Sequence, residues 1–231
     1  MLLALDSSTR QVGLALLDPK RGILAEWFWR AGDHHTRALA PMVRLLLEQV
    51  GVGWEEVKAL GVALGPGSFT GLRAGLALAK GLAYTRRLPL VGVSTLDVVA
   101  AGVPVEREAR LAATLEAGRG RLAVNWYRPA QEGETPTAGG WVHERGPQVL
   151  TAAQLAHAIQ GPTLVAGELQ PEEQARLRRR WKKVRVLPPA WCVRRPGLLA
   201  ELAWRRWQGG AGDDPATLAP IYLHTGTPIP A

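Results

Sequence analysis

The chain has 231 residues, 47% of them hydrophobic, and a chain of this length buries about 70% of its unfolded surface on folding. Its 26 glycines and 17 prolines are spread without a fixed period, which excludes collagen-like and low-complexity sequences. The opening apolar run lacks a basic region and is broken at Asp6, no apolar stretch is long enough to cross a bilayer, and Cys192 is the only cysteine. We therefore expect a globular, cytoplasmic protein with no signal peptide, membrane segment or internal disulfide.

The formal net charge is +8, which favours an anionic partner only where the basic residues are gathered in one place. One dense run is present, on a short predicted helix and the segment that follows it. Its members are Arg176, Arg178, Arg179, Arg180, Lys182, Lys183 and Arg185, with Trp181 among them. A solvated helix face is the first interpretation. Contact with a nucleic-acid backbone is the alternative, although the run carries no base-reading pattern.

The N-terminal part begins with three predicted strands joined by turn-rich segments. They are Leu2–Leu5, Val12–Leu17 and Ile23–Trp29. A helix is expected to begin at residues 33–36 and to end at Val50, because apolar residues recur at helical spacing and Gly51 follows. The next predicted elements are a strand at Leu60–Leu64, a helix at Gly71–Arg86, a strand at Leu90–Val93 and a short helix from Ser94. This mixed α/β order favours a ribonuclease-H-like sheet covered by helices.

The pattern pauses around residues 102–108, where we place the boundary between two domains, residues 1–103 and 104–231. The second domain is expected to be smaller and degenerate, and whether its C-terminal tail returns to the first domain stays open. Its predicted strands are Leu111–Leu115, Leu122–Tyr127, the partly extended Trp141–Leu150, Pro162–Ala166 and a short one at Pro220–Leu223. Its clearest predicted helices are one from the Thr151 capping box to about Gln160 and one at Pro196–Gln208, before Gly209.

A glycine-rich loop with the sequence GPGSFTGLR leads from the strand at Leu60–Leu64 into the next helix. We call it the motif loop, and its candidate site residues are Gly65, Pro66, Gly67, Ser68, Phe69, Thr70, Gly71 and Arg73. Free amides at a helix N-terminus can hold an anion, but the spacing matches neither the dinucleotide fingerprint nor a Walker A loop. The spacing favours a structural turn in which Ser68 or Thr70 caps the helix.

The segment Leu60–Asp97, which contains the motif loop, closely resembles the TsaB (YeaZ) family. Three shorter pieces follow the family's order: the opening LLALDSST, His35-Thr36-Arg37 and Pro220-Ile-Tyr-Leu223. The resemblance covers the N-terminal domain well and the rest thinly. It implies an α/β fold of two ribonuclease-H-like domains of the actin, sugar-kinase and Hsp70 type, with mixed sheets flanked by helices.

The resemblance also implies a role without catalysis. Proteins of this family bind and activate the catalytic subunit TsaD in the complex that forms N6-threonylcarbamoyladenosine (t6A) in tRNA. A TsaE-type ATPase and the tRNA would be reached through that complex, and a homodimer is expected when the partner is missing. No catalytic residue, metal or cofactor is expected in this chain.

The sequence shares one feature with the enzymes of this superfamily and departs from them in another. Members that use ATP bring an aspartate of the first hairpin and an acidic residue of the second domain to a metal–nucleotide complex, and Asp6 and Glu116 stand near those places. The catalytic sister family carries two metal-binding histidines one helical turn apart, and Thr95 and Val99 occupy those positions here. The adjoining pair at residues 34 and 35 is not expected to bind a metal.

The two helices of the first domain are the expected partner surface. The helix at Gly71–Arg86 is apolar nearly all round, and since one sheet covers only one of its faces, the other face needs a partner. The candidate contact residues are Leu39, Met42, Val43, Leu46, Leu72, Leu76 and Lys80. The resemblance implies that these helices pack against the matching helices of TsaD.

Three other functions stay open. An ATP-dependent small-molecule kinase of the same superfamily would need a glycine-rich adenosine loop, which residues 209–212 only approximate. A peptidase would need a base beside Ser68, for which the sequence offers no nearby candidate. A tRNA-binding module would bind RNA without any partner and in a salt-dependent manner.

Overall fold

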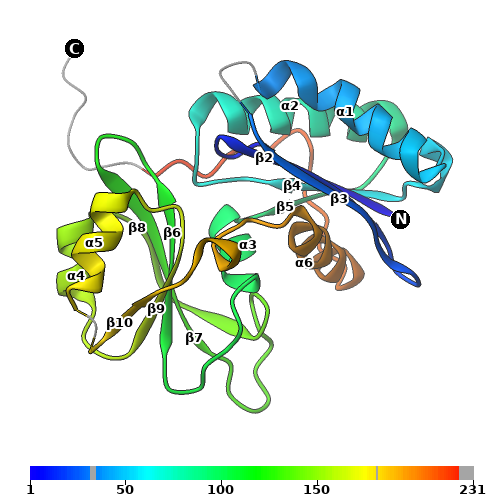
Figure 1. The fold of residues 1–231 in the computed structure, drawn as a ribbon. Coiled ribbons are helices and arrows are strands. Elements are labelled where there is room, and N and C mark those ends of the chain that lie inside the picture. The colour runs from blue at the N-terminus through cyan, green and yellow to red at the C-terminus, as the bar shows by residue number, and fades with distance from the viewer. Residues whose placement is uncertain (32–34, 181, 224–231) are drawn as a thin grey trace. The chain divides into compact units, whose positions relative to one another are not determined.

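The structure, a computed structural model, describes residues 1–31, 35–180 and 182–223, without the side chains of residues 35–38. The chain forms two compact units (Figure 1). The first comprises Met1–Val98 and Arg194–Ile221, and the second comprises Val99–Val193 with the described residues 222 and 223. Each unit contains one 5-stranded sheet and helices of its own.

The first sheet joins an antiparallel meander to parallel strands, in the spatial order β3-β2-β1-β4-β5. Its strands are β1 (Leu2–Asp6), β2 (Gln11–Asp18), β3 (Gly22–Arg30), β4 (Ala59–Ala63) and β5 (Leu90–Val93). β1 pairs antiparallel with β2 and parallel with β4, so it lies at the centre of the sheet and is buried throughout. The three strands predicted from the opening sequence are confirmed to within one residue at each end.

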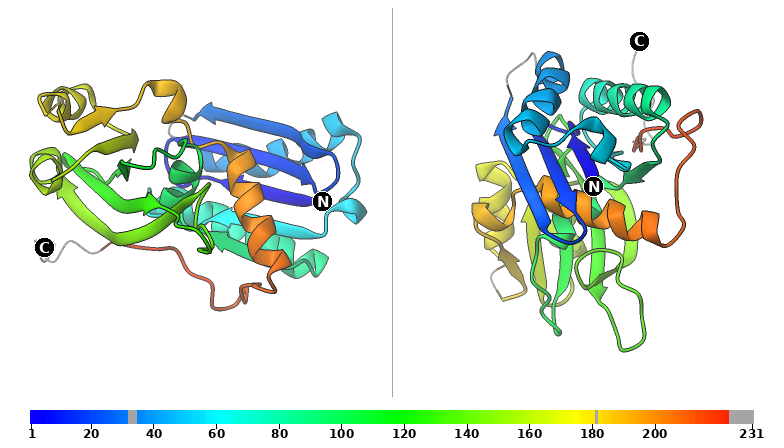
Figure 2. Two further views of the ribbon diagram at one scale, coloured as in Figure 1. Left: turned by 90° about the horizontal axis from the view of Figure 1, so that it is seen from below. Right: turned by 90° about the vertical axis from the view of Figure 1, so that its right-hand side faces the viewer.

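Helices cover both faces of the first sheet, two on one face and one on the other (Figures 1 and 2). They are α1 (His35–Val50) and α2 (Phe69–Arg86) on one face and α6 (Pro196–Gln208), orange in Figure 2, on the other. Leu3 and Leu5 of β1 share a hydrophobic core with α1 and α2. Ala203 of α6 meets Gly61 of β4 on the opposite face. Because side chains alternate along a strand, each strand of this sheet contributes to both layers.

The boundaries of α6 are those predicted from Pro196 and Gly209. Proline fits the first turn of a helix because the N–H that it lacks has no partner there. Glu26 of β3 fixes the start of the helix, since its Oε1 accepts from the Gly197 amide at 2.8 Å and its Oε2 accepts from Arg195 Nη2 at 2.6 Å. These contacts attach α6 to the first sheet.

The division of the chain differs from the predicted one at residue 103. The boundary falls inside α3 (Thr95–Ala101), and the segment Arg194–Ile221 packs with the first unit. The segment after α6 also packs on the first unit, where Asp213 Oδ2 accepts a hydrogen bond from the Gly92 amide of β5 at 2.7 Å. The first unit is built from two separate segments of the chain, so a single domain boundary cannot describe it. The second segment supplies α6, which covers the face of the first sheet that α1 and α2 leave open.

The second sheet has the spatial order β10-β9-β6-β7-β8. Read from the β8 edge, it has the same topology as the first sheet read from the β3 edge. Its strands are β6 (Arg110–Glu116), β7 (Arg121–Pro129), β8 (Trp141–Thr151), β9 (Thr163–Gly167) and β10 (Val184–Val186). β6, β7 and β8 form an antiparallel meander, and β9 and β10 add in parallel beside β6. The fold class is therefore confirmed as two ribonuclease-H-like α/β units.

Two helices, α4 (Ala152–Ala158) and α5 (Pro171–Arg178), pack on the second sheet around a core that includes Trp126. The capping box predicted for α4 is confirmed. Thr151 Oγ1 accepts from the Gln154 amide at 3.2 Å, and Gln154 Oε1 accepts from the Thr151 amide at 2.8 Å.

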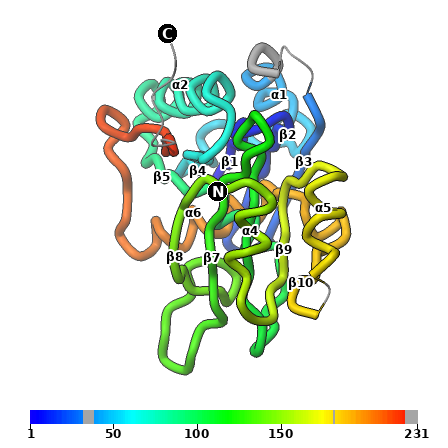
Figure 3. The backbone as a smooth tube through the Cα atoms, turned by 90° about the vertical axis from the view of Figure 1, so that its left-hand side faces the viewer, coloured from blue at the N-terminus to red at the C-terminus, as the bar shows by residue number. Residues whose placement is uncertain are grey.

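The basic run begins on a helix and continues on the segment after it, as predicted, because α5 ends at Arg178 and β10 follows at the edge of the second sheet (Figure 3). One local prediction in the second half is corrected. The strand predicted at residues 220–223 is not formed, since these described residues lie in no helix or strand. A backbone hydrogen bond from the Ile221 amide to the Leu64 carbonyl oxygen, at 2.7 Å, attaches Ile221 to the first unit.

Candidate functional site

The side chain of Asp6 stabilises the turn of the hairpin between β1 and β2. Its Oδ1 accepts hydrogen bonds from the Ser8 amide at 2.8 Å and from Ser8 Oγ at 2.5 Å. Aspartates commonly stabilise turns in this way, by bonding the backbone two residues on. Asp6 is only 2% exposed, so its negative charge needs a partner within the protein.

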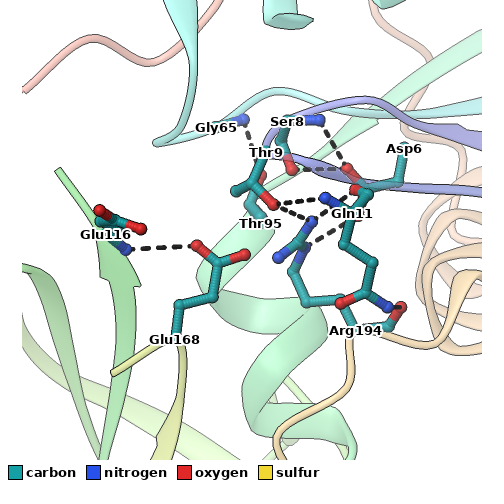
Figure 4. Close-up of polar contacts among 9 residues, drawn as sticks. All are labelled: Asp6, Ser8, Thr9, Gln11, Gly65, Thr95, Glu116, Glu168 and Arg194. Carbon is teal, nitrogen blue, oxygen red and sulfur yellow. Dashed lines mark hydrogen bonds and ion pairs between the residues drawn. The ribbon is translucent and has the colours of Figure 1, made fainter. Parts of the chain in front are cut away.

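Arg194 supplies that partner (Figure 4). Its Nε donates to Asp6 Oδ2 at 3.0 Å, and its Nη2 donates to Thr9 Oγ1 at 2.7 Å and to Gln11 O at 2.8 Å. Arg194 is 1% exposed and stands just before α6, so the helix that covers the sheet also delivers the guanidinium to the hairpin. No local signal marks this arginine in the sequence, because an exposed arginine before a helix would look the same.

The motif loop lies against the same hairpin. The Ser68 amide donates to Ser8 O at 2.6 Å, and Ser7 Oγ donates to Gly71 O at 2.8 Å. Ser68 Oγ accepts from the Gly71 amide at 3.3 Å, so the predicted N-cap role of Ser68 is confirmed. A Cβ atom at Gly67 would stand 2.0 Å from Ser8 O, which explains why the loop needs a glycine there.

The hydrogen bonds of the loop favour the structural turn over an anion site. The amides of Ser68 and Gly71 are engaged as described, and the Gly65 amide donates to Thr95 Oγ1 at 2.9 Å. The remaining loop residues divide by exposure: Pro66 is buried, and Phe69, Thr70 and Arg73 are exposed. The hydrogen bonds of this loop therefore hold the start of α2 to the hairpin.

A divalent metal at the hairpin would need free carboxylate oxygens, because Mg²⁺ binds through oxygen ligands. Both oxygens of Asp6 already accept hydrogen bonds, and the guanidinium of Arg194 adds a positive charge beside them. In the second unit, Glu116 ends β6 and its Oε2 accepts from Gln170 Nε2 at 3.1 Å. The residues around Asp6 do not fit a metal–nucleotide complex. Among the residues that the structure describes, no group of three or more His, Cys, Asp or Glu side chains could hold a metal ion.

The positions that the resemblance equates with metal-binding histidines hold core side chains. Thr95 is fully buried and accepts from the Gly65 amide, and Val99 is buried as well. Neither side chain offers a nitrogen ligand. The adjoining histidines considered for metal binding fall outside the described residues, His34 entirely and His35 in its side chain.

Five of the predicted partner contacts are buried residues of the first unit. They are Leu39, Val43, Leu46, Leu72 and Leu76, while Met42 and Lys80 are partly buried. The helical spacing that selected them marks the face that a helix buries, and here the first sheet and the motif loop already cover that face. The structure thus corrects the assignment of these five residues, while the assignment of Met42 and Lys80 stays a prediction.

The outer face of α2 carries a second set of residues, which the apolar periodicity did not single out. We call it the outer stripe, and it comprises the exposed residues Phe69, Arg73, Ala77, Gly81 and Tyr84. Phe69 is 57% exposed and Tyr84 is 84% exposed, and the Arg73 guanidinium lies 4.8 Å from the centroid of the Phe69 ring.

Within the described part of the chain, no helix combines the length and the hydropathy of a membrane span.

The basic run does not act as one helix face. Arg180 donates to Ala156 O, and Arg185 pairs with Glu106, so these two side chains are committed to the second unit. Trp181 lies outside the described residues. The solvated interpretation and the nucleic-acid interpretation of the run both stay predictions.

Comparison with known proteins gives a family for the chain. A family model described as TsaD, tRNA N6-adenosine threonylcarbamoyltransferase, matches residues 16–139. The tRNA threonylcarbamoyladenosine biosynthesis protein TsaB of Escherichia coli (strain K12) is 35% identical over 133 residues, which are 57% of this chain and 57% of that protein. TsaB of Haemophilus influenzae is 41% identical over 99 residues, 43% of this chain and 41% of that one. The chain thus spans little more than half the length of the first relative and less than half of the second.

A solved structure extends the likeness to both units. YeaZ from Pseudomonas aeruginosa matches with a TM-score of 0.75 and 27% identity, over 96% of this chain and 99% of that chain. The second unit, in which the sequence resemblance is thin, is therefore included in the structural match. The chain belongs to the TsaB (YeaZ) family, within the wider family of TsaD-type tRNA N6-adenosine threonylcarbamoyltransferase domains.

Proposed function

We propose that this chain is a non-catalytic subunit of the machinery that forms N6-threonylcarbamoyladenosine in tRNA, and that it acts by binding a TsaD-type catalytic subunit. Its relatives from Escherichia coli and Haemophilus influenzae are named tRNA threonylcarbamoyladenosine biosynthesis proteins, which supports the pathway. A TsaE-type ATPase and the tRNA would meet the chain through the catalytic subunit. The chain itself would bind no cofactor.

The observation that carries the proposal is the outer stripe of α2. The inner face of this helix is already buried through Leu72, Leu76 and Ala79, so the helix needs no second cover to stay folded. It nevertheless exposes two aromatic rings with the small residues Ala77 and Gly81 between them. Aromatic and arginine side chains are enriched in the centres of protein interfaces, and small residues let another backbone come close.

A TsaD-type protein suits this surface because it carries a domain of the same kind. The TsaD family model matches residues 16–139, a span that includes α1 and α2. The partner is therefore expected to present matching helices, and two similar helix faces can meet in a nearly symmetric contact. A second copy of this chain presents the same face, so a homodimer is expected when the catalytic subunit is absent.

Glutamate substitutions in the outer stripe test the proposal. Ala77→Glu and Tyr84→Glu should weaken binding to the TsaD-type protein of the same organism about 30-fold or more, because burying an unpaired carboxylate in the contact costs at least about 2 kcal/mol. Isothermal titration calorimetry measures the affinity. Both sites are exposed, so the free energy of unfolding should change by less than about 0.5 kcal/mol.

Phe28→Glu is the matched control. Phe28 is 48% exposed on β3, and strand alternation puts it on the face away from Trp27 and Trp29, which pack toward the core of α1 and α2. This variant should bind the partner as the unchanged protein does. Full affinity in the two stripe variants, or an equal loss in Phe28→Glu, would contradict the assignment of the surface.

A further inference from the structure

The buried ion pair between Asp6 and Arg194 has no place in the partner contact proposed above. Both side chains are almost inaccessible, whereas the outer stripe is exposed. Taking two charges out of water is unfavourable unless their geometry and their further hydrogen bonds compensate for it. The surroundings of each charge therefore show what the pair does.

The carboxylate of Asp6 is surrounded by donors. Oδ1 accepts from the amide and the hydroxyl of Ser8, and Oδ2 accepts from Arg194 Nε at 3.0 Å. An ionised carboxylate only accepts, and here both of its oxygens are engaged. A metal ion would have to displace either the turn of the hairpin or the guanidinium.

The guanidinium of Arg194 is held from several sides at once. Its Nη2 donates to Thr9 Oγ1 and to Gln11 O, and its backbone carbonyl accepts from Gln11 Nε2 at 3.2 Å. A guanidinium keeps its charge in proteins, and its planar fork of donors suits several acceptors at fixed angles. These contacts fix the cation against one carboxylate and one turn.

We infer that Arg194 is a built-in cation that takes the place of a metal ion at the first hairpin. It neutralises Asp6 permanently and repels a second cation from the same carboxylate. The inference goes beyond the proposed function and does not depend on it, since it concerns the isolated chain.

The organisation of the motif loop follows from the same contacts. Asp6 sets the position of Ser8, and Ser8 O accepts from the amide of Ser68, the residue that caps α2. Arg194 thus acts as a positioning residue for the hairpin and, through the hairpin, for the start of α2.

The unchanged protein gives the first test. Mn²⁺ broadens the NMR signals of nuclei near its binding site, and Mg²⁺ at the same concentration serves as the diamagnetic reference. The amide signals of Ser8 and Ser68 should show no selective broadening at millimolar Mn²⁺. Selective broadening of these two signals would overturn the inference, and this arm needs no variant to fold.

Removing the cation gives the second test. In Arg194→Met, Asp6 is left as a buried carboxylate without a counter-charge, so millimolar Mg²⁺ should raise the melting temperature by about 3 °C or more. The double variant Asp6→Asn/Arg194→Met lacks the carboxylate and should show no such rise. If the single variant responds to Mg²⁺ no more than the double variant, Arg194 does not stand in for a metal.

Two further substitutions of Arg194 allow the Mg²⁺ response to be tested in other ways. If Arg194→Met does not fold, Arg194→Gln retains hydrogen-bond donors toward Thr9 and Gln11 and is compared in the same way with Asp6→Asn/Arg194→Gln. Arg194→Lys retains the charge, so its melting temperature should fall without becoming sensitive to Mg²⁺, because an ammonium cannot reproduce the fork of donors. A Mg²⁺ response in Arg194→Lys as large as that in Arg194→Met would contradict the role of the charge.

Discussion

Arg128 and Glu134 face each other at the base of the loop that joins β7 to β8. The two terminal nitrogens of Arg128 donate to the two carboxylate oxygens at 2.6 and 2.7 Å, and the Gln131 amide donates to Oε2 at 2.8 Å. These donors, Arg128 first, favour the ionised carboxylate and lower the pKa of Glu134 to about 2. The Gly/Pro/Thr-rich loop is thereby anchored at one of its ends.

The sign of the resulting pH dependence follows from the lowered pKa of Glu134. Its ordinary value is 4.5, so the pair stabilises the fold above about pH 4.5, and this contribution disappears as the pH falls to about 2. The pair lies at the surface, where such contributions are small, so the titration of the carboxyl is the better measurement. Carbon-detected NMR should give a midpoint of about 2 for Glu134, and Arg128→Gln should raise it toward 4.5. A midpoint already near 4.5 in the unchanged protein would show that the pair does not form in solution.

At the scale of the element, α2 combines an inner face that the fold requires with an outer face that the fold leaves exposed. Two of its glycines illustrate the difference. A Cβ atom at Gly75 would stand 2.0 Å from Ser7 Oγ, whose hydroxyl is bonded to Gly71 O, while a Cβ atom at Gly81 would meet nothing within 4 Å. The first glycine permits close packing on the hairpin, and the second has no such role in the isolated chain.

The two glycines therefore predict opposite effects of the same substitution. Gly75→Ala should lower the free energy of unfolding by about 1–3 kcal/mol, because Ser7 has to move and give up its bond. Gly81→Ala should raise it by about 0.5–1 kcal/mol, because alanine restricts the unfolded chain and favours a helix. Urea unfolding of both variants measures the difference. Equal effects of the same sign would mean that the packing of α2 on the hairpin is not as described.

Elements whose ends are marked by nearby capping, proline or glycine residues could be predicted from the sequence. Elements that depend on a neighbour distant in the sequence could not. The bounds of α6 follow from Pro196 and Gly209, and Ser68 was recognisable as a helix cap. β10 spans only Val184–Val186, which is too short to show alternation, and it exists because β9 offers it an edge.

The same limit applies to the candidate site. Apolar spacing identifies the buried face of α1 and α2 and not the exposed one, so it points to Leu39 and Leu76, which belong to the core. Arg194 reaches Asp6 across a separation of 188 residues, which no local pattern reports. The roles of such residues depend on burial and on pairing across long sequence separations, and both are properties of the fold.

At the scale of the whole molecule, two units repeat one topology with different local chemistry. Asp6 ends the central strand of the first sheet, and Glu116 ends the corresponding strand of the second. In the first unit the carboxylate is neutralised by Arg194, and in the second it accepts from a glutamine side chain. A scaffold of this kind, with a closed hairpin and an exposed helix face, suits a protein that acts through binding.

Reconstitution of tRNA modification tests this central claim most directly. N6-threonylcarbamoyladenosine in a tRNA transcript is measured by mass spectrometry, with the TsaD-type subunit and the other pathway proteins present, and with or without this chain. We predict that the chain accelerates product formation at least about 10-fold, a change of about 1.4 kcal/mol in the barrier, and that without the catalytic subunit it forms no product and consumes no ATP. Product formation or ATP turnover by the chain alone, or an unchanged rate when it is left out, would contradict the claim.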